Sequence, residues 1–447
     1  MSLWFQTALL PSGWTAKVRF TLSAGRIARV EAGVEPGAGD ERHAIAIPGL
    51  ANVHSHAFQR GMAGLAETRG PEGDNFWTWR EVMYRFLDRL EPEDVEAIAA
   101  LAYIEMLETG FTRVGEFHYL HNTPSGATYD DVAELAERIA AAASATGIGL
   151  TLLPVFYAHS NFGGAPPVPG QRRFINSVDG FAALMARCAK IVASLDDANL
   201  GVAPHSLRAV TPEELAAILP MRGPVHIHVA EQVKEVEDSV AWSGARPVEW
   251  LLDNAPVNQR WCLVHATHMT GHEAAALAQR CAVAGLCPVT EANLGDGIFP
   301  MEDFLAFDGR YGIGTDSNVL IDPAGELRAL EYAQRLLRRA RNLVPRTQGQ
   351  STGRALFDGA LAGGAQALGQ GATGLRDGAP ADLMSFASGQ PSLEGRSGDA
   401  ILDSWIFAGA RADCVWRFGR QVVTGGRHPL RGPVEERYRQ AMRRVLG

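Results

Sequence analysis

The stretch PGLANVHSH, residues 48–56, contains a short apolar run that ends in two histidines, His54 and His56. Seven more short apolar runs follow, with amphipathic helical stretches between them; they cover 112–117, 149–157, 200–205, 225–230, 261–266, 282–289 and 311–315. This alternation predicts repeated βα units and a parallel sheet. Eight parallel strands would close a TIM-like (β/α)8 barrel, so we expect an α/β fold of that type over residues 49–369.

The two ends of the chain show a different pattern. Residues 1–48 alternate in the manner of short strands with glycine-containing turns, and strand-like runs return at 381–386, 414–418 and 422–423. We expect residues 1–48 and 370–447 to build one small β-sandwich domain beside the barrel. Within the barrel, Thr211-Pro212-Glu213-Glu214 predicts a capped helix start, and residues 131–145 before Gly147 predict another helix.

Composition limits the class of protein. The chain has 447 residues, 46% of them hydrophobic, which suits one large catalytic domain with a smaller accessory one. Its 41 basic and 50 acidic residues give a net charge of −9 without a basic stripe, so nucleic acid is not the expected partner. No signal-peptide pattern and no long apolar window is present, so we expect a cytoplasmic protein with no membrane partner. Five scattered cysteines predict reduced thiols.

The histidines at the ends of the predicted strands suggest metal chemistry. Residues i and i+2 of a strand project to the same face, so His54 and His56 would point together into the barrel mouth. A His-x-His pair alone is often polar surface or core. A second pair, His226 and His228, ends the fifth strand, and Glu231, His265 and Asp316 also lie at predicted strand ends, on the catalytic face of a barrel. Imidazole and carboxylate suit zinc or ferrous iron, and such a metal lowers the pKa of a bound water, which favours hydrolysis.

These residues resemble the amidohydrolase superfamily over essentially the whole chain. The resemblance implies that His54, His56, His228 and Asp316 bind one divalent metal, most simply Zn2+ with Fe2+ as the alternative. It also implies that Glu231 is the proton shuttle, that His265 positions substrate and water, and that Asp316 accepts a proton. Binuclear members often use a bridging lysine, but none of the three lysines of this chain ends the third or fourth strand.

Longer motifs resemble the formimidoylglutamate deiminase family, within the deaminase branch. They are HAFQR at 56–60, FWTWR at 76–80, EFHY at 116–119, APHSLR at 203–208 and TEANLGDG at 290–297. The resemblance implies hydrolysis of N-formimino-L-glutamate to N-formyl-L-glutamate and ammonia, in histidine degradation, by a homodimer. It also implies that the glutamyl part of this small, amino-acid-derived substrate is held by Gln59, Arg80, Tyr119, His205 and Arg208. Guanidinium groups bind carboxylates in a bidentate manner, which agrees with a substrate that carries two carboxylates.

Three alternatives stay open on the sequence. An aminohydrolase of a purine, pyrimidine or triazine ring would have the same metal residues, although two arginines do not suit a neutral ring. A barrel without catalysis is possible because fold alone does not fix function. A binuclear amidase would need the bridging lysine. Asn52 and Ser317 are hypothesised to orient metal ligands, whereas His118 and His121 are interpreted as loop residues.

Overall fold

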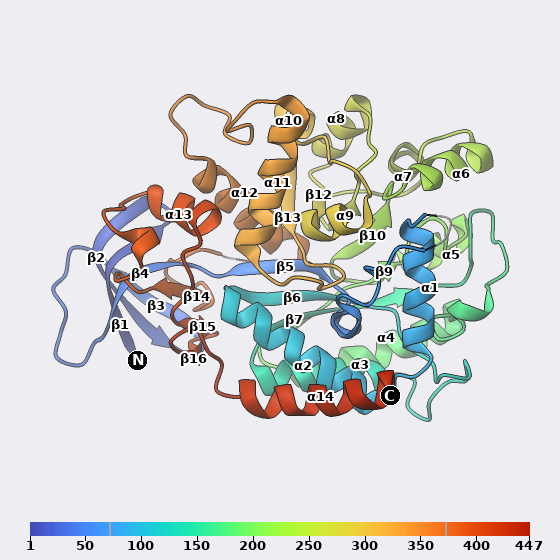
Figure 1. The fold of residues 1–447 in the computed structure, drawn as a ribbon, viewed down its shortest axis with the longest axis horizontal. Coiled ribbons are helices and arrows are strands. Elements are labelled where there is room, and N and C mark those ends of the chain that lie inside the picture. The colour runs from blue at the N-terminus through green and yellow to red at the C-terminus, as the bar shows by residue number, and fades with distance from the viewer. Residues whose placement is uncertain (71–72, 372) are drawn as a thin grey trace.

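Parallel strands curl into a barrel at the centre of the computed structural model, which describes residues 1–70, 73–371 and 373–447 (Figure 1). Their order is β10-β11-β12-β13-β5-β6-β7-β8, and β9 also pairs with β7. Bridges between Val202 and Val225 and between Ser206 and His228 join the two ends of this order. The bounds are β5 (Leu50–Ser55), β6 (Phe111–His118), β7 (Gly149–Phe156), β8 (Asn199–Leu200), β9 (Ala203–Pro204), β10 (Val225–Val229), β11 (Trp261–His265), β12 (Val283–Leu286) and β13 (Arg310–Ile313). The TIM-like barrel is therefore confirmed.

Two of the predicted strands differ from the observed ones. The run 200–205 is divided into the short strands β8 and β9, which together occupy the fourth position of the barrel. The run 282–289 is shorter than expected because β12 ends at Leu286 and Pro288 begins helix α9 (Pro288–Leu294). Proline has no N–H for a strand ladder, and its fixed φ suits the first turn of a helix.

Helices surround the barrel (Figure 1). They are α2 (Pro92–Thr109), α3 (Glu134–Thr146), α4 (Val178–Ala193), α5 (Pro212–Ile218), α6 (Val233–Ser243), α7 (Pro247–Asn254), α8 (Gly271–Gln279), α10 (Met301–Ala306), α11 (Pro323–Arg338) and α12 (Thr352–Ala367). The predicted cap of α5 is confirmed, because the hydroxyl of Thr211 accepts from the amide of Glu214 at 3.3 Å and the amide of Thr211 donates to the carboxylate of Glu214 at 2.8 Å. The predicted helix 131–145 begins three residues later than expected, at Glu134, and ends before Gly147 in the left-handed conformation.

The two ends of the chain meet in a second sheet with the order β16-β15-β14-β4-β1-β2-β3. Its strands are β1 (Ser2–Leu10), β2 (Gly13–Ser23), β3 (Arg26–Glu31), β4 (Glu41–Pro48), β14 (Leu383–Phe386), β15 (Val415–Arg417) and β16 (Arg420–Val423). Both ends of the chain thus contribute to one β unit as expected, but it is a single mixed sheet and not a sandwich of two sheets. This sheet curls over its own core, because the amide of Ile27 donates to the carbonyl of Ala379 and the amide of Ala381 donates to that of Gly25, both at 2.9 Å.

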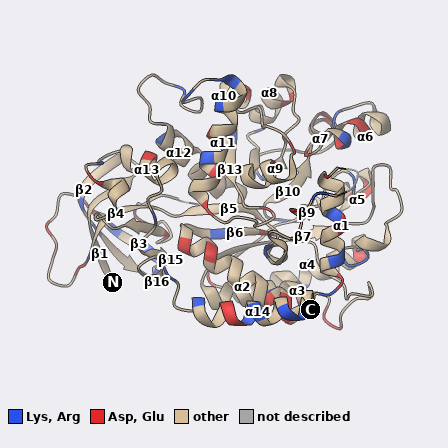
Figure 2. Cartoon of the chain, viewed as in Figure 1, with Lys and Arg blue, Asp and Glu red and all other residues tan. Residues whose placement is uncertain are grey.

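The C-terminal segment also contains helices that the strand pattern did not predict, α13 (Ala400–Ala408) and α14 (Arg431–Leu446). Helix α14 lies along α2 on the barrel, and both signs of charge alternate along it (Figures 1 and 2). The guanidinium of Arg431 contacts Glu108 at 2.8 Å and Glu105 at 3.3 Å, while Val434 and Val445 are buried. The division of the chain at residues 48 and 370 stays a prediction.

No helix within residues 1–70, 73–371 and 373–447 has the length and the apolar character needed to cross a membrane.

Candidate active site

Three histidines and one aspartate converge at the carboxyl ends of the barrel strands. His54 lies in β5 and His56 directly follows this strand, His228 lies in β10, and Asp316 follows β13. The Nε2 atom of His54 lies 3.1 Å from that of His56 and 3.0 Å from that of His228. The Oδ1 atom of Asp316 lies 3.3 Å from His54 Nε2 and 3.2 Å from His56 Nε2. All four ligand atoms lie within 4.8 Å of one another.

The hydrogen bonds of the imidazoles define where their protons lie. His56 Nδ1 is 2.9 Å from the carbonyl oxygen of Phe117, and His228 Nδ1 is 3.0 Å from that of His205. A carbonyl oxygen only accepts, so Nδ1 is protonated in both rings and, in the neutral rings, Nε2 presents a lone pair. These lone pairs face His54 Nε2 and the oxygen of Asp316. Such a concentration of lone pairs is unfavourable without a cation among them.

The donor set fits a divalent metal. Ligand atoms bound tetrahedrally at zinc distances are separated by about 3.3 Å, close to the spacing found here. Burial lowers the pKa of His54 to about 3, which keeps the imidazole neutral. Burial raises the pKa of Asp316, but the neighbouring imidazoles of His54 and His56 outweigh it and hold that pKa well below its usual value. Each of these groups is therefore in the protonation state that metal binding requires.

Asn52 and Ser317, hypothesised to orient the ligands, contact the backbone and neighbouring side chains. The side-chain oxygen of Asn52 accepts from the amides of His54 at 3.3 Å and Thr315 at 3.1 Å, so it ties β5 to the end of β13. The hydroxyl of Ser317 is 2.9 Å from that of Thr290. The orienting role of both residues stays a hypothesis.

Asn318 was missed by the sequence reasoning. Its side-chain amide donates to the carbonyls of His56 at 3.1 Å and Asp316 at 3.2 Å. Asp316 itself has φ 44°, in the left-handed region that non-glycine residues rarely adopt. Asn318 therefore stabilises a strained turn that aims the carboxylate of Asp316 at the histidines.

Glu231 and His265 lie beside the proposed ligands. His265 Nε2 is 3.7 Å from Glu231 Oε1 and 3.9 Å from Asp316 Oδ2. Burial raises the pKa of Glu231. Burial lowers the pKa of His265, but the carboxylates of Glu231, Glu291 and Asp316 outweigh this effect and raise it to about 10. The arrangement thus combines a protonated imidazole with a carboxyl group that can be protonated, which is suitable for moving protons.

Glu291 is a second site residue whose role the sequence pattern did not indicate, although it lies in the stretch 290–297. Its Oε1 atom lies 3.2 Å from His265 Nδ1 and accepts from the amide of Cys287 at 2.9 Å. A carboxylate here orients the imidazole of His265. The only sign of this contact in the sequence was that Glu291 follows closely, along the chain, after the carboxyl end of β12.

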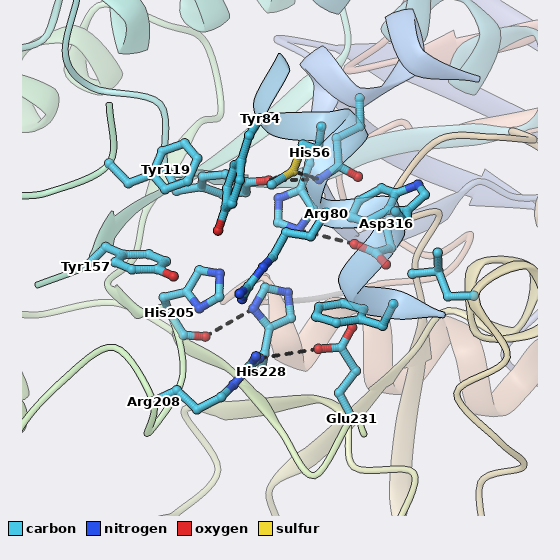
Figure 3. Close-up of a pocket in the computed structure, with 16 residues that line it drawn as sticks. His56, Arg80, Tyr84, Tyr119, Tyr157, His205, Arg208, His228, Glu231 and Asp316 are labelled. Carbon is cyan, nitrogen blue, oxygen red and sulfur yellow. Dashed lines mark hydrogen bonds and ion pairs between the residues drawn. The ribbon is translucent and has the colours of Figure 1, made fainter. Parts of the chain in front are cut away.

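The five residues expected to hold the substrate line one pocket with Glu231, Asp316, His56 and His228 (Figure 3). They are Gln59, Arg80, Tyr119, His205 and Arg208. Helix α1 (Phe76–Leu87) covers one side and contributes Arg80, whose guanidinium carbon lies 4.5 Å from the centre of the Trp77 ring. The pocket is also lined by Phe76, Trp79, Met83, Tyr84, Tyr157, Phe174 and Leu294.

Several of these pocket residues contact one another or Glu231. The amide of Gln59 donates to the Tyr119 hydroxyl at 2.8 Å, and this hydroxyl lies 3.2 Å from the sulfur of Met83. One guanidinium nitrogen of Arg208 is 3.5 Å from Glu231 Oε2, so this arginine contacts Glu231 as well as lining the pocket. Burial lowers the pKa of His205 well below its usual value, so His205 is neutral.

His118 and His121 lie apart from the four-residue cluster. His121 is a loop residue as expected, but His118 is not, because it is the last residue of strand β6. His121 Nε2 is 2.9 Å from the carbonyl oxygen of Val155, and its ring lies 5.5 Å from that of His118. Among the described residues, the cluster around His54 includes neither of them.

Three histidines and an aspartate that are placed to bind a metal at the mouth of a TIM-like barrel indicate the class of this chain, and comparison with known proteins agrees. The model of the amidohydrolase family matches residues 45–415, so the chain belongs to that family. Residues 3–44 match the model described as formimidoylglutamate deiminase HutF, N-terminal domain.

Individual proteins and solved structures are also similar to this chain. Formimidoylglutamate deiminase of Pseudomonas aeruginosa is 52% identical over 454 residues, which cover 100% of this chain and 99% of that protein. The crystal structure of an amidohydrolase from Brucella melitensis is 55% identical with a TM-score of 0.97 and covers 100% of both chains. An adenosine deaminase of Xanthomonas campestris with bound zinc shares the fold, with a TM-score of 0.82 at 22% identity over 100% of this chain and 98% of that one.

Proposed function

We propose that this chain hydrolyses N-formimino-L-glutamate to N-formyl-L-glutamate and ammonia, as a deiminase of histidine degradation. The observation that carries the proposal is that Arg80 and Arg208 line the same pocket as Glu231 and three members of the four-residue cluster, His56, His228 and Asp316. The substrate carries two carboxylates and a linear amidine, and paired guanidinium groups recognise carboxylates. The 52% identical relative, a formimidoylglutamate deiminase, supports the same choice.

The proposed metal ligands are His54, His56, His228 and Asp316. The proposed metal is a single divalent ion, with Zn2+ as the first choice and Fe2+ as the alternative. The imidazole-rich donor set supports zinc, and metal analysis of the purified protein tests the choice. A metal held by these four residues would lower the pKa of a water molecule to roughly 7 and so would supply a nucleophile at neutral pH.

The roles of the protein groups follow from their positions. Asp316 accepts a proton from the attacking water, and protonated His265 orients the carboxylates of Glu231 and Asp316. Glu231, with its raised pKa, delivers a proton to the departing nitrogen. The oxygen of water bonds to the formimino carbon, the bond from that carbon to the terminal nitrogen breaks, and ammonia leaves.

The substrate residues have proposed positions around this centre. We assign Gln59, Arg80, Tyr119, His205 and Arg208 to the glutamyl part, which directs the formimino carbon toward the proposed metal. Neutral His205 is available as a hydrogen-bond partner, and Arg80 and Arg208 supply the positive charge.

Ammonia release from N-formimino-L-glutamate by metal-loaded protein tests the proposal, with guanine, cytosine and adenine-type substrates in parallel and the organic product identified. Ammonia together with N-formyl-L-glutamate is the expected result. Activity on rings alone would contradict the roles of Arg80 and Arg208. Arg208→Met is expected to raise KM for the formimino substrate by about 10- to 100-fold, because a charge-assisted contact is lost.

We further propose that the enzyme is a cytoplasmic homodimer. Five free cysteines support a reducing compartment. Leu336 and Leu337 on α11, 80% and 52% exposed, support an additional protein contact. Light scattering of the purified protein tests the dimer; a monomer at micromolar concentration would contradict it.

A further inference from the structure

The pocket contains a phenol, Tyr157, whose hydroxyl is oriented from behind by a buried amide. Gln171 is completely buried, and its oxygen accepts from the backbone amide of Val168 at 2.9 Å. Because a backbone N–H can only donate, the oxygen of Gln171 must face Val168. The nitrogen of Gln171 therefore faces Tyr157 and donates to the phenolic oxygen at 2.8 Å.

This contact leaves the proton of Tyr157 available. The phenolic oxygen already accepts from Gln171, and within residues 1–70, 73–371 and 373–447 no acceptor is hydrogen-bonded to the hydroxyl proton. Burial raises the pKa of Tyr157 in spite of the nearby guanidinium groups of Arg80 and Arg208, so the phenol stays neutral and keeps its proton. Tyr157 is thus a hydrogen-bond donor that lacks an acceptor.

The surroundings indicate which acceptor fits. Tyr157 lines the pocket with Arg80 and Arg208, and Figure 3 shows its hydroxyl directed toward the space that the guanidinium of Arg80 enters. Its ring lies 4.5 Å from that of His205, which in turn lies 4.9 Å from that of His228. The ring of His205 thus packs against both that of Tyr157 and that of the proposed ligand His228.

We propose that Tyr157, oriented by Gln171, is a specificity-determining donor to the substrate carboxylate that Arg80 and Arg208 bind. The inference rests on the proposed function and deepens it. Two guanidinium groups and one neutral phenol would surround the carboxylate with donors only. The phenol adds a directed donor without adding charge, and its hydrogen bond to a charged carboxylate is stronger than one to a neutral amide of the same shape.

Two substitutions test the arrangement from both sides. Tyr157→Phe removes the donor and keeps the ring. Gln171→Glu keeps an oxygen for the amide of Val168 but replaces the nitrogen with an acceptor, so the phenol would donate to it and turn away from the ligand. Tyr332→Phe on the exposed side of α11 is the matched control, since it also removes one phenolic hydroxyl.

The first measurement is calorimetric binding of glutarate, a dicarboxylate that needs no turnover, to metal-loaded protein. We expect Tyr157→Phe and Gln171→Glu each to weaken binding by about 10- to 100-fold, as for loss of a hydrogen bond to a charged group, and Tyr332→Phe to leave it unchanged. Unchanged glutarate affinity in Tyr157→Phe, or no glutarate binding by the unaltered protein, would overturn the proposal. Retained far-ultraviolet dichroism and melting temperature exclude misfolding as the cause.

The second measurement is kcat/KM for N-formimino-L-glutamate and its two monoamides. The loss in Tyr157→Phe should fall mainly on KM and should be at least fivefold smaller for one monoamide, which identifies the recognised carboxylate. An equal loss on all three compounds would overturn the proposal. If the unaltered protein does not release ammonia while the glutarate result holds, the proposed function fails and the carboxylate site stands.

Discussion

Gly314 holds the strand that carries Asp316 against the strand that carries His54, and its replacement by alanine is a precise test of the metal site. A Cβ atom at residue 314 would lie 2.8 Å from both the nitrogen and the oxygen of His54 and 2.9 Å from its Cβ. These atoms cannot rotate away, because the carbonyl of His54 accepts from the amides of Thr315 at 3.1 Å and Asp316 at 2.9 Å. The amide of Gly314 is also fixed, by the carbonyl of Leu286 at 2.8 Å.

The size of the effect follows from these contacts. Non-bonded carbon atoms prefer a separation of about 3.5 Å, so the strands must separate by about 0.6 Å. The Oδ1 atom of Asp316 and Nε2 of His54 are 3.3 Å apart. Because metal sites tolerate deviations of only about 0.2 Å, Gly314→Ala should weaken metal binding about 10- to 100-fold. Overpacking should also destabilise the apoprotein by about 2 kcal/mol, or about 2 °C in Tm for a chain of this length.

Competition with a chromogenic chelator measures metal affinity, and calorimetry of the metal-free protein measures Tm. Gly271→Ala is the matched control, because a Cβ at the first residue of α8 would meet no atom within 4 Å. We expect excess metal to restore part of the activity of Gly314→Ala. Unaltered metal affinity in Gly314→Ala, with the Tm of the control, would refute the reasoning.

Three further outcomes are expected. Glu231→Gln should bind one equivalent of metal but lose about 10²- to 10⁴-fold in kcat, since it cannot transfer a proton; wild-type turnover would exclude Glu231 as the shuttle. Burial lowers the pKa of His121 to about 4, below its unfolded value of 6.5, so its contribution to stability is complete above pH 6.5 and is lost as the pH falls toward 4. Urea unfolding should therefore lose about 3 kcal/mol more between these pH values in the unaltered protein than in His121→Gln, and parallel curves would contradict this. A thiol reagent at pH 8 should modify one cysteine rapidly in the native protein, because Cys281 is exposed and the other four are buried; the reaction should disappear in Cys281→Ser, and rapid reaction of two thiols would disagree.

Local patterns in the sequence were sufficient for the barrel. Short apolar runs and amphipathic stretches have periods that depend only on backbone geometry, so the strands and the cap at Thr211 could be predicted. The end of β12 could not be located as well, because an apolar run before Pro288 is compatible with either a strand or a buried helix. Helix α14 was not predicted, because it has few apolar residues and these are buried only by packing against α2.

The candidate site shows the same division. The sequence by itself determined that the histidines and acidic residues at the strand ends meet at one face of the barrel. The reason is that side-chain direction in a strand is fixed and parallel strands end on one face. Only the tertiary structure decided that Glu291 reaches His265, that Asn318 holds the turn of Asp316, and that Gln171 orients Tyr157. These contacts join residues brought together by chain folding and loop conformation. Whether these hydrogen bonds form depends on differences of a few tenths of an ångström in the separation of the atoms, and no local sequence pattern encodes such differences.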